Sequence, residues 1–225
     1  MAALELEPVN RQSTSEMIAD RLRDAVMRGT LEPGAQLGEA DLAAHFQVSR
    51  GPVREAMQRL VSEGLLHSIR NRGIFVVELS FDDIVDVYTA RGVIERGAVE
   101  LILDGKREAA HAALQPSVAR MLAAAENDDA VGVSDADHAF HQLLVETGGS
   151  PRLVRAARTL LIETRMCLGA LQTTYTDVRE QAQEHVLLRD AILHKPADEI
   201  FALLAAHMDD AVTRLRGRFR ATSSR

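Results

Sequence analysis

The chain has 225 residues, enough for one large domain or two modest ones, each with its own hydrophobic core. Hydrophobic residues make up 46% of it and aromatic residues only 4%, so aliphatic side chains must fill the cores and helices are favoured. The formal net charge of −7 disfavours nonspecific coating of nucleic acid, and the single cysteine, Cys167, excludes an intrachain disulfide and is expected to be a small buried hydrophobe.

Two further features concern the compartment. No run of about 18 apolar residues occurs, so no transmembrane helix is expected. The first residues lack the basic start and the apolar run of a signal peptide. We therefore expect a protein of the reducing cytoplasm.

The first third of the chain predicts three helices and a hairpin. Residues 1–12 have the composition of a flexible arm, after which apolar residues recur at helical spacing up to Gly29. Helices are expected over 15–28, 39–46 and 49–64, with a turn at 30–37 and β-prone runs at 65–69 and 74–79. Three helices plus a two-stranded β-wing make a winged helix-turn-helix, which we expect to span residues 13–79.

The third of these helices carries the strongest functional signal. Ser49 stands at its N-cap, and Arg50 and Arg54 lie one turn apart beside an apolar stripe. An exposed helix N-terminus with two arginines can hold phosphate and reach guanine edges. A solvated arginine face on an ordinary amphipathic helix is the simpler alternative. The short helix before it and the basic hairpin tip after it, with Arg72 and Gly73, favour DNA recognition.

The same segments resemble a known family. Over residues 12–79 the chain is similar to the N-terminal signature of GntR-superfamily transcription regulators, through the motifs Glu39-Ala40-Asp41-Leu42-Ala43, Val48-Ser49-Arg50-Gly51-Pro52-Val53-Arg54-Glu55-Ala56, Glu63-Gly64-Leu65 and Asn71-Arg72-Gly73. The resemblance implies DNA contacts from Ser49, Arg50, Arg54, Arg72 and Gly73. Gly51 departs from the family, which usually has threonine there, and some members carry arginine in place of Ala40, so the half-site preference is expected to differ.

The remainder predicts an all-helical bundle over residues 80–217. Helical periodicity without strand signals favours helices at 81–104, 107–126, 134–147, 151–171, 176–193 and 196–217. The last residues, 218–225, have the composition of a flexible tail. The whole chain is therefore expected to be mainly α, with the winged helix-turn-helix followed by the bundle.

Histidines recur on the apolar faces of these helices. Asp137 and His141 are four residues apart, and the apolar stripes of two later helices include His185 and His207, whereas His138 and His194 are expected to point outward. A shared metal would satisfy all four inward groups. Two simpler interpretations stay open. An inward histidine is usually a hydrogen-bonded core residue, as His111 is expected to be, and Asp137 completes a capping box with Ser134.

A second resemblance bears on this choice. Asp137-x-x-Phe140-His141, with His185 and His207 on the last two helices, is similar to the metal-binding pattern of the FCD effector domain, found in the FadR-type branch of the GntR superfamily. It spans roughly residues 81–217. The resemblance implies a divalent metal held by Asp137, His141, His185 and His207, with a small organic acid completing its coordination. Zinc is favoured, and the mixed N/O ligands also suit Ni, Co, Mn or Fe.

Two arginines are candidates for binding the effector. Arg91 interrupts an apolar stripe, and an inward guanidinium needs an anion, which is either Glu95 one turn on or an effector carboxylate. Arg165 lies at the edge of its stripe, where a surface position is the alternative.

Together these features predict a homodimeric transcription regulator that binds a double-stranded inverted-repeat operator and responds to a small organic acid. It is not expected to be an enzyme. The rival hypothesis is a metal-dependent hydrolase that uses the three histidines and the aspartate to activate water. The sequence has no His-Glu-x-x-His element, and this hypothesis gives the basic wing no role. A third interpretation makes the bundle a dimerisation module only.

Overall fold

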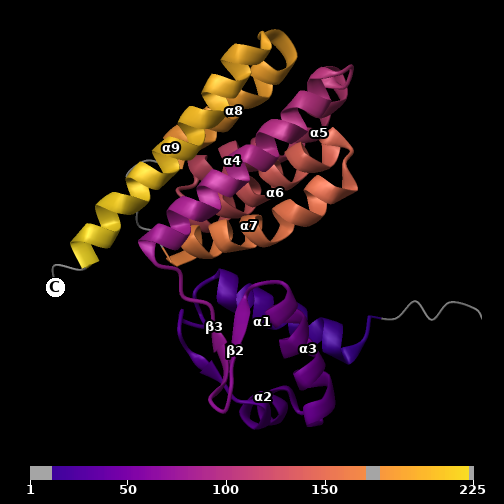
Figure 1. The fold of residues 1–225 in the computed structure, drawn as a ribbon, viewed down its shortest axis with the longest axis vertical. Helices are drawn as coiled ribbons and strands as arrows, with labels where there is room; N and C mark the ends of the chain where they lie inside the picture. Colours follow the sequence, from indigo (N-terminus) through magenta and orange to yellow (C-terminus); the bar gives the residue numbers. More distant parts are fainter. Residues whose placement is uncertain (1–11, 171–177, 223–225) are drawn as a thin grey trace, which may run out of the picture.

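The computed structural model describes residues 12–170 and 178–222. An N-terminal head (residues 12–79) lies against one side of a helical bundle (residues 80–222), as Figure 1 shows. The predicted arm at 1–12 falls almost wholly outside the described residues, as do the predicted break at 173–174 and the first residues of the helix predicted at 176–193. None of the described helices is long and apolar enough to cross a membrane.

The head consists of three helices and a small sheet. Its elements are α1 Thr14–Met27, β1 Gln36–Leu37, α2 Glu39–Phe46, α3 Arg50–Ser62, β2 Leu66–Ile69 and β3 Gly73–Val76. A capping box begins α1, where the Ser13 hydroxyl accepts from the Glu16 amide and the Glu16 carboxylate accepts from the Ser13 amide. The stripe on α3 packs inward as predicted, with Val53, Met57 and Leu60 fully buried. The mainly α fold with an N-terminal winged helix-turn-helix is confirmed.

The wing contains one strand more than the two that the sequence predicts. β3 pairs with β2 in the expected antiparallel hairpin, and β1 pairs with the other edge of β3, giving the order β1-β3-β2. The segment at 30–37 was predicted as a turn. A strand of two residues is too short to show alternation, and it forms because the β3 edge presents free backbone groups, with the Val76 amide donating to the Ala35 carbonyl at 2.9 Å.

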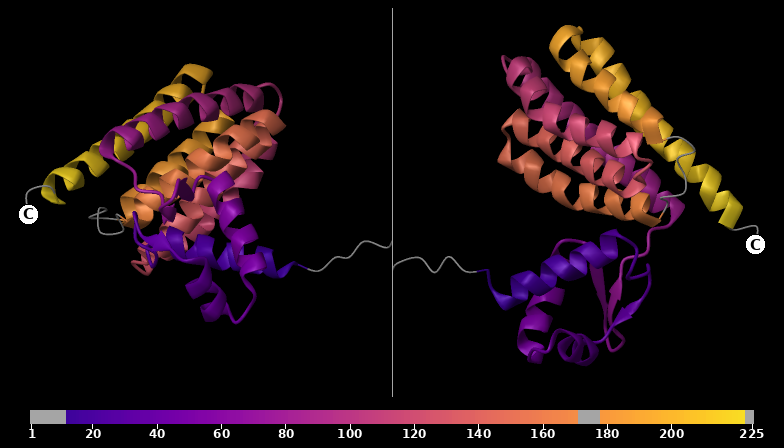
Figure 2. Two further views of the ribbon diagram at one scale, coloured as in Figure 1. Left: turned by 60° about the horizontal axis from the view of Figure 1, so that its bottom comes forward. Right: turned by 180° about the vertical axis from the view of Figure 1, so that it is seen from behind.

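The bundle places α6 at its centre. Its helices are α4 Phe81–Leu103, α5 Arg107–Glu126, α6 Ala130–Gly148, α7 Pro151–Ala170, α8 Val178–His194 and α9 Ala197–Thr222. α6 packs against α4, α5, α7 and α8, while α9 runs beside α4 and α8 (Figures 1 and 2). α9 continues to Thr222, so the residues 218–222, predicted as part of a flexible tail, are helical.

The start of α6 differs from the prediction. The helix begins at Ala130, where the Asp129 carboxylate accepts from the Gly132 amide at 3.0 Å, and not at residue 134. Ser134 therefore lies inside the helix, and the predicted capping box between Ser134 and Asp137 is wrong. Because Asp137 has no capping role, its buried carboxylate needs other partners.

Head and bundle meet along α7. Ile162 and Met166 on α7 belong to the hydrophobic core of the head, so the two parts share a packed boundary. The turn after α3 approaches α7 closely: Gly64 has φ +81°, and a Cβ there would lie 2.8 Å from the Thr159 methyl group. Figure 2 shows this boundary from two further sides.

Candidate functional site

Four side chains from three helices meet inside the bundle. Asp137 and His141 come from α6, one turn apart, His185 from α8 and His207 from α9; we call them the His–Asp cluster. All four are buried, and one ligand atom from each lies within 4.8 Å of the others. The Nε2 atom of His141 is 3.2 Å from both other Nε2 atoms, and His185 Nε2 is 3.1 Å from Asp137 Oδ1.

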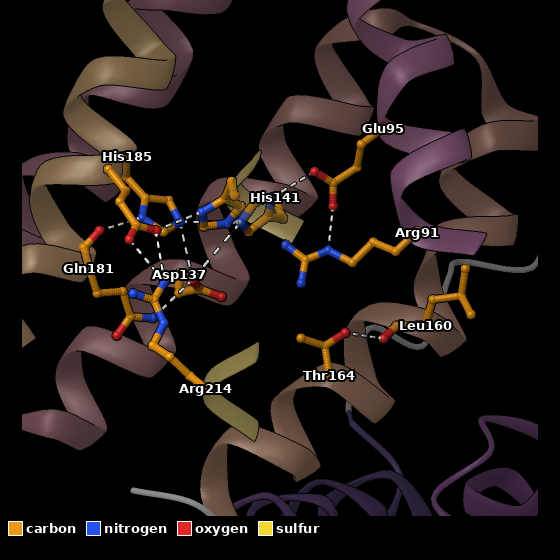
Figure 3. Close-up of polar contacts among 11 residues, drawn as sticks. Arg91, Glu95, Asp137, His141, Leu160, Thr164, Gln181, His185 and Arg214 are labelled. Atoms are coloured by element: carbon orange, nitrogen blue, oxygen red, sulfur yellow. Dashed lines mark hydrogen bonds and ion pairs between the residues drawn. The ribbon is translucent and has the colours of Figure 1, made fainter. Parts of the chain in front are cut away.

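The Nδ1 atom of each imidazole in the cluster lies within hydrogen-bond distance of an oxygen acceptor. His141 Nδ1 lies 2.8 Å from Glu95 Oε2, and the other two contacts join His185 to the Gln181 carbonyl at 2.8 Å and His207 to Glu184 at 3.0 Å. Because each acceptor takes a hydrogen from Nδ1, each Nε2 keeps a bare lone pair, and the three Nε2 atoms face one another; Figure 3 shows this for His141 and His185. Three lone pairs and a carboxylate repel each other unless a cation lies between them, so the donor set fits a metal ion.

The protonation states suit metal ligation. Burial lowers the pKa of His141 to about 4, and burial also lowers the pKa of His207. Burial alone would raise the pKa of Asp137, but its contacts with His185 and His141 outweigh it and hold that pKa well below its usual range. At neutral pH Asp137 is therefore a carboxylate, and His141 and His207 are neutral imidazoles, the forms that bind metal.

Arg91 lies beside the cluster and is almost fully buried, 2% exposed. Its Nε donates to Glu95 Oε1 at 2.5 Å, so Glu95 bridges the guanidinium and His141. Burial favours the neutral acid, but Arg91 and His141 hold the pKa of Glu95 at about 2. Figure 3 shows the guanidinium pointing toward the cluster, and its buried Nη2 has no hydrogen-bond partner in the described part of the chain. The structural and the effector interpretations of Arg91 are thus both compatible with its surroundings.

Arg165 is not on the surface. Only 2% of it is exposed, and its Nη2 donates to Asp135 Oδ1 at 2.5 Å. Asp135, on the neighbouring α6, is itself exposed, so it is the packing of α6 against α7 that buries the guanidinium. Its Nη1 is buried and finds no acceptor among residues 12–170 and 178–222.

The histidines outside the cluster do not all have the exposure that the sequence predicts. His194 is exposed, as predicted. His138 was expected to point outward and is instead half-buried, because α7 packs against that face of α6. His111 is partly exposed and contacts Asp190 at 3.3 Å, outside the His–Asp cluster. Cys167 is buried as expected, and burial raises the pKa of its thiol to about 12.

Sequence reasoning missed the acceptors behind the histidines. Glu184 follows no pattern that pairs it with His207, since the two lie on different helices and meet only in the fold. It also accepts from Arg214 at 2.9 Å. Gln181 was detectable in part, because it lies four residues before His185 on one face of α8, and its side-chain amide donates to Asp137 at 3.2 Å.

In the head, the predicted residues on α3 are exposed. Ser49 is the N-cap, with φ −73° and ψ 162°, and its hydroxyl makes no capping hydrogen bond. Arg50 is the first helical residue, and Arg54 donates to both Glu39 oxygens, at 2.8 Å in the shortest contact. A Cβ at Gly51 would meet nothing within 4 Å, so packing does not require glycine there.

The tip of the wing lies between β2 and β3. Gly73 has φ +111°, a conformation that strains other residues. The Gln36 side-chain amide donates to the Arg72 carbonyl at 2.7 Å and would lie 2.9 Å from a Cβ at Gly73, so β1 supports the tip directly. Arg72 itself is exposed.

Comparison with known families matches both parts of the chain. Residues 14–76 match the family described as bacterial regulatory proteins, gntR family, and residues 86–210 match the FCD domain. The chain belongs to the GntR family of transcriptional regulators, with an FCD domain after its winged helix-turn-helix. The metal-dependent hydrolase is thereby set aside, because the family and the relatives are regulators.

Relatives of this GntR regulator cover most of both chains. The gluconate operon transcriptional repressor of Bacillus subtilis is 30% identical over 207 residues, 90% of this chain and 85% of the repressor. The uncharacterized HTH-type transcriptional regulator BphR of Paraburkholderia xenovorans is 28% identical over 214 residues, 92% and 87% of the two chains. A crystal structure of a putative GntR regulator from Rhodococcus sp. RHA1 superposes with a TM-score of 0.78 at 28% identity, covering 92% of this chain and 99% of that one.

Proposed function

We propose that this regulator is a homodimer that binds an inverted-repeat operator. Its affinity for the operator changes when a small organic acid binds in its metal-bearing bundle. The observation that carries the proposal is the His–Asp cluster, in which three imidazole Nε2 atoms and the Asp137 carboxylate face one another while an acceptor lies at each Nδ1. A divalent metal, with zinc the first candidate, would be held by Asp137, His141, His185 and His207 and would offer an open position to a carboxylate.

Arg91 supports an anionic effector. It is charged and buried, and its Nη2 lacks a partner within the described residues even after Glu95 is paired. A carboxylate bound to the metal could accept from this group in a charge-assisted hydrogen bond. Arg165, also buried with a free Nη1, is the second candidate for the same role. The name of the gluconate operon repressor among the relatives agrees with a sugar acid or related organic acid as the class of effector.

The head supports operator recognition through two elements. The proposed contacts are Ser49, Arg50 and Arg54 at the exposed N-terminus of α3, entering the major groove, and Arg72 with Gly73 at the wing tip, beside it. A two-fold dimer would place one head on each half-site and impose an inverted repeat on the operator. Since effector and operator affinities are linked, each ligand would change the affinity for the other by the same factor.

Two measurements test the proposal together. Selection from random duplex DNA should enrich an inverted repeat, and at moderate salt the selected site should bind about 10³-fold or more tightly than bulk DNA. A thermal-shift screen of organic acids, with and without a chelator, should find acids that stabilise the metal-loaded protein only. Enrichment of no sequence contradicts operator recognition, and an acid response that survives chelation contradicts the metal-bound effector.

Replacing Arg91 by glutamine should weaken binding of the acid found in that screen at least tenfold, because a charged hydrogen bond contributes about 1.5–3 kcal/mol. Calorimetric titration of the acid into metal-loaded protein measures the change. The metal content of Arg91→Gln, by elemental analysis, is the control and should stay near that of the wild type. Unchanged acid affinity at full metal content would leave Arg91 as a structural partner of Glu95 only.

A further inference from the structure

An ion pair joins the two helices of the helix-turn-helix at its exposed face. Glu39 is the first residue of α2, and Arg54 lies in the second turn of α3. The Arg54 Nε atom donates to both Glu39 oxygens, at 3.0 and 3.2 Å, and its Nη2 atom donates to Oε2 at 2.8 Å. The Glu39 carboxylate therefore occupies one side of the guanidinium, the side formed by Nε and Nη2.

This contact leaves the far end of the guanidinium free. The group has five N–H donors in one plane, and Glu39 takes those on the Nε side. Nη1 has no hydrogen-bond partner among residues 12–170 and 178–222, and the Arg54 side chain is 62% exposed. One hydrogen of Nη1 and one of Nη2 remain side by side at the end of the group. Two parallel donors of this kind match O6 and N7 of guanine.

Without Glu39 the same guanidinium would have a competing partner. A free arginine at the DNA surface can turn to the nearest phosphate, which carries no sequence information. The Glu39 carboxylate opposes that movement, because it repels phosphate and attracts the guanidinium toward α2. The hydrogen bond from Arg54 lowers the pKa of Glu39, so the carboxylate is charged at neutral pH.

We propose that Glu39 is a positioning residue for base recognition. It holds Arg54 with the Nη1–Nη2 end toward the DNA, so that Arg54 binds guanine rather than phosphate. Glu39 thus lowers the affinity for bulk DNA and raises the preference for the operator. The inference rests on the operator recognition proposed above, and it adds a residue that sets the specificity and the base that is read.

A structural role is the simpler alternative for Glu39. A carboxylate in the first turn stabilises a helix through its dipole, and Asp41 lies in the same turn of α2. The Asp41 carboxylate lies beside Gly38 and makes no ion pair with the residues that the structure describes. Asp41→Asn therefore removes the same charge from the same turn without affecting Arg54, and it is the matched control.

Mobility shift of the full-length protein, with the selected operator and with bulk DNA at several salt concentrations, tests the role of Glu39. Glu39→Gln should lower the ratio of operator to bulk affinity at least tenfold, and single-base substitutions of the operator should place the loss at one guanine in each half-site. On bulk DNA the freed Arg54 should bind one more phosphate in each protomer. The plot of log affinity against log salt should therefore steepen by about 2 for a dimer. Asp41→Asn should change neither quantity.

A double variant shows whether Glu39 acts through Arg54. In an Arg54→Ala protein, Glu39→Gln should leave the salt dependence on bulk DNA unchanged, because no guanidinium is released. Steepening that persists there overturns the proposal, as does an unchanged affinity ratio in Glu39→Gln when the wild type selects an operator. Equal losses in Glu39→Gln and Asp41→Asn also overturn it and leave the structural role. A wild type that selects no operator contradicts the proposed function and this inference together.

Discussion

Arg54→Ala should abolish specific operator binding while the protein stays folded. A bidentate arginine on guanine accounts for about a 10- to 100-fold preference for the correct base, and a two-fold dimer contains the contact twice, so operator affinity should fall about 10²- to 10⁴-fold. The fold should survive, because the side chain is exposed and its ion pair with Glu39 lies at the surface. Electrophoretic mobility shift with the selected operator measures the loss.

Arg59→Ala is the matched control for this experiment. Arg59 lies on the same helix, and its guanidinium contacts Glu16 of α1 at 3.5 Å, away from the helix N-terminus. Its removal takes away the same charge and should change operator affinity far less. Equal losses in the two variants would mean that only net charge matters and that α3 does not read bases. An unchanged affinity in Arg54→Ala would refute the placement of the recognition helix.

His141→Ala should remove the metal that we propose for the His–Asp cluster. His141 is the central member of the His–Asp cluster, in contact with both other imidazoles and with Glu95. Loss of an outer partner costs roughly 10- to 100-fold in metal affinity, so loss of the central ligand itself should cost at least about 10²-fold. At metal concentrations near 100 times the wild-type dissociation constant, bound metal adds about 2.7 kcal/mol, or about 5–10 °C in melting temperature, and this increment should vanish.

Elemental analysis and thermal melting with and without chelator check this result. His194→Ala is the control, because His194 is exposed at the end of α8 and takes no part in the cluster. It should keep the metal and the response to chelator. Wild-type protein that carries no metal after purification without chelators, and that melts identically with and without added zinc, would leave the bundle as a dimerisation module only.

Much of the head was predictable because its signals are local. The apolar stripe on α3, Gly29 after α1 and the basic tip before β3 are each made by residues that are neighbours in the sequence. β1 was not predictable in this way. It exists because β3, nearly forty residues later, offers an edge with free hydrogen-bonding groups.

The bundle shows where helical periodicity is insufficient. Asp137 and His141 share a face at i, i+4 spacing, so their common direction could be read directly. The capping box at Ser134 was wrong because Asp129 caps the helix one turn earlier. Arg165, at the edge of its stripe, was interpreted as either surface or site, and only the packing of α6 against α7 buries it.

The amino-acid sequence by itself determined the winged helix-turn-helix, the all-helical bundle and the inward direction of Asp137, His141, His185 and His207, because helix faces and caps depend on neighbours within one or two turns. Only the tertiary structure decided that these four groups converge within 4.8 Å and that an acceptor lies behind each histidine. It also decided that a cavity lies between head and bundle. Those features depend on how separate helices pack. Packing brings together residues that are far apart in the sequence, and their spacing gives no sign of the contact.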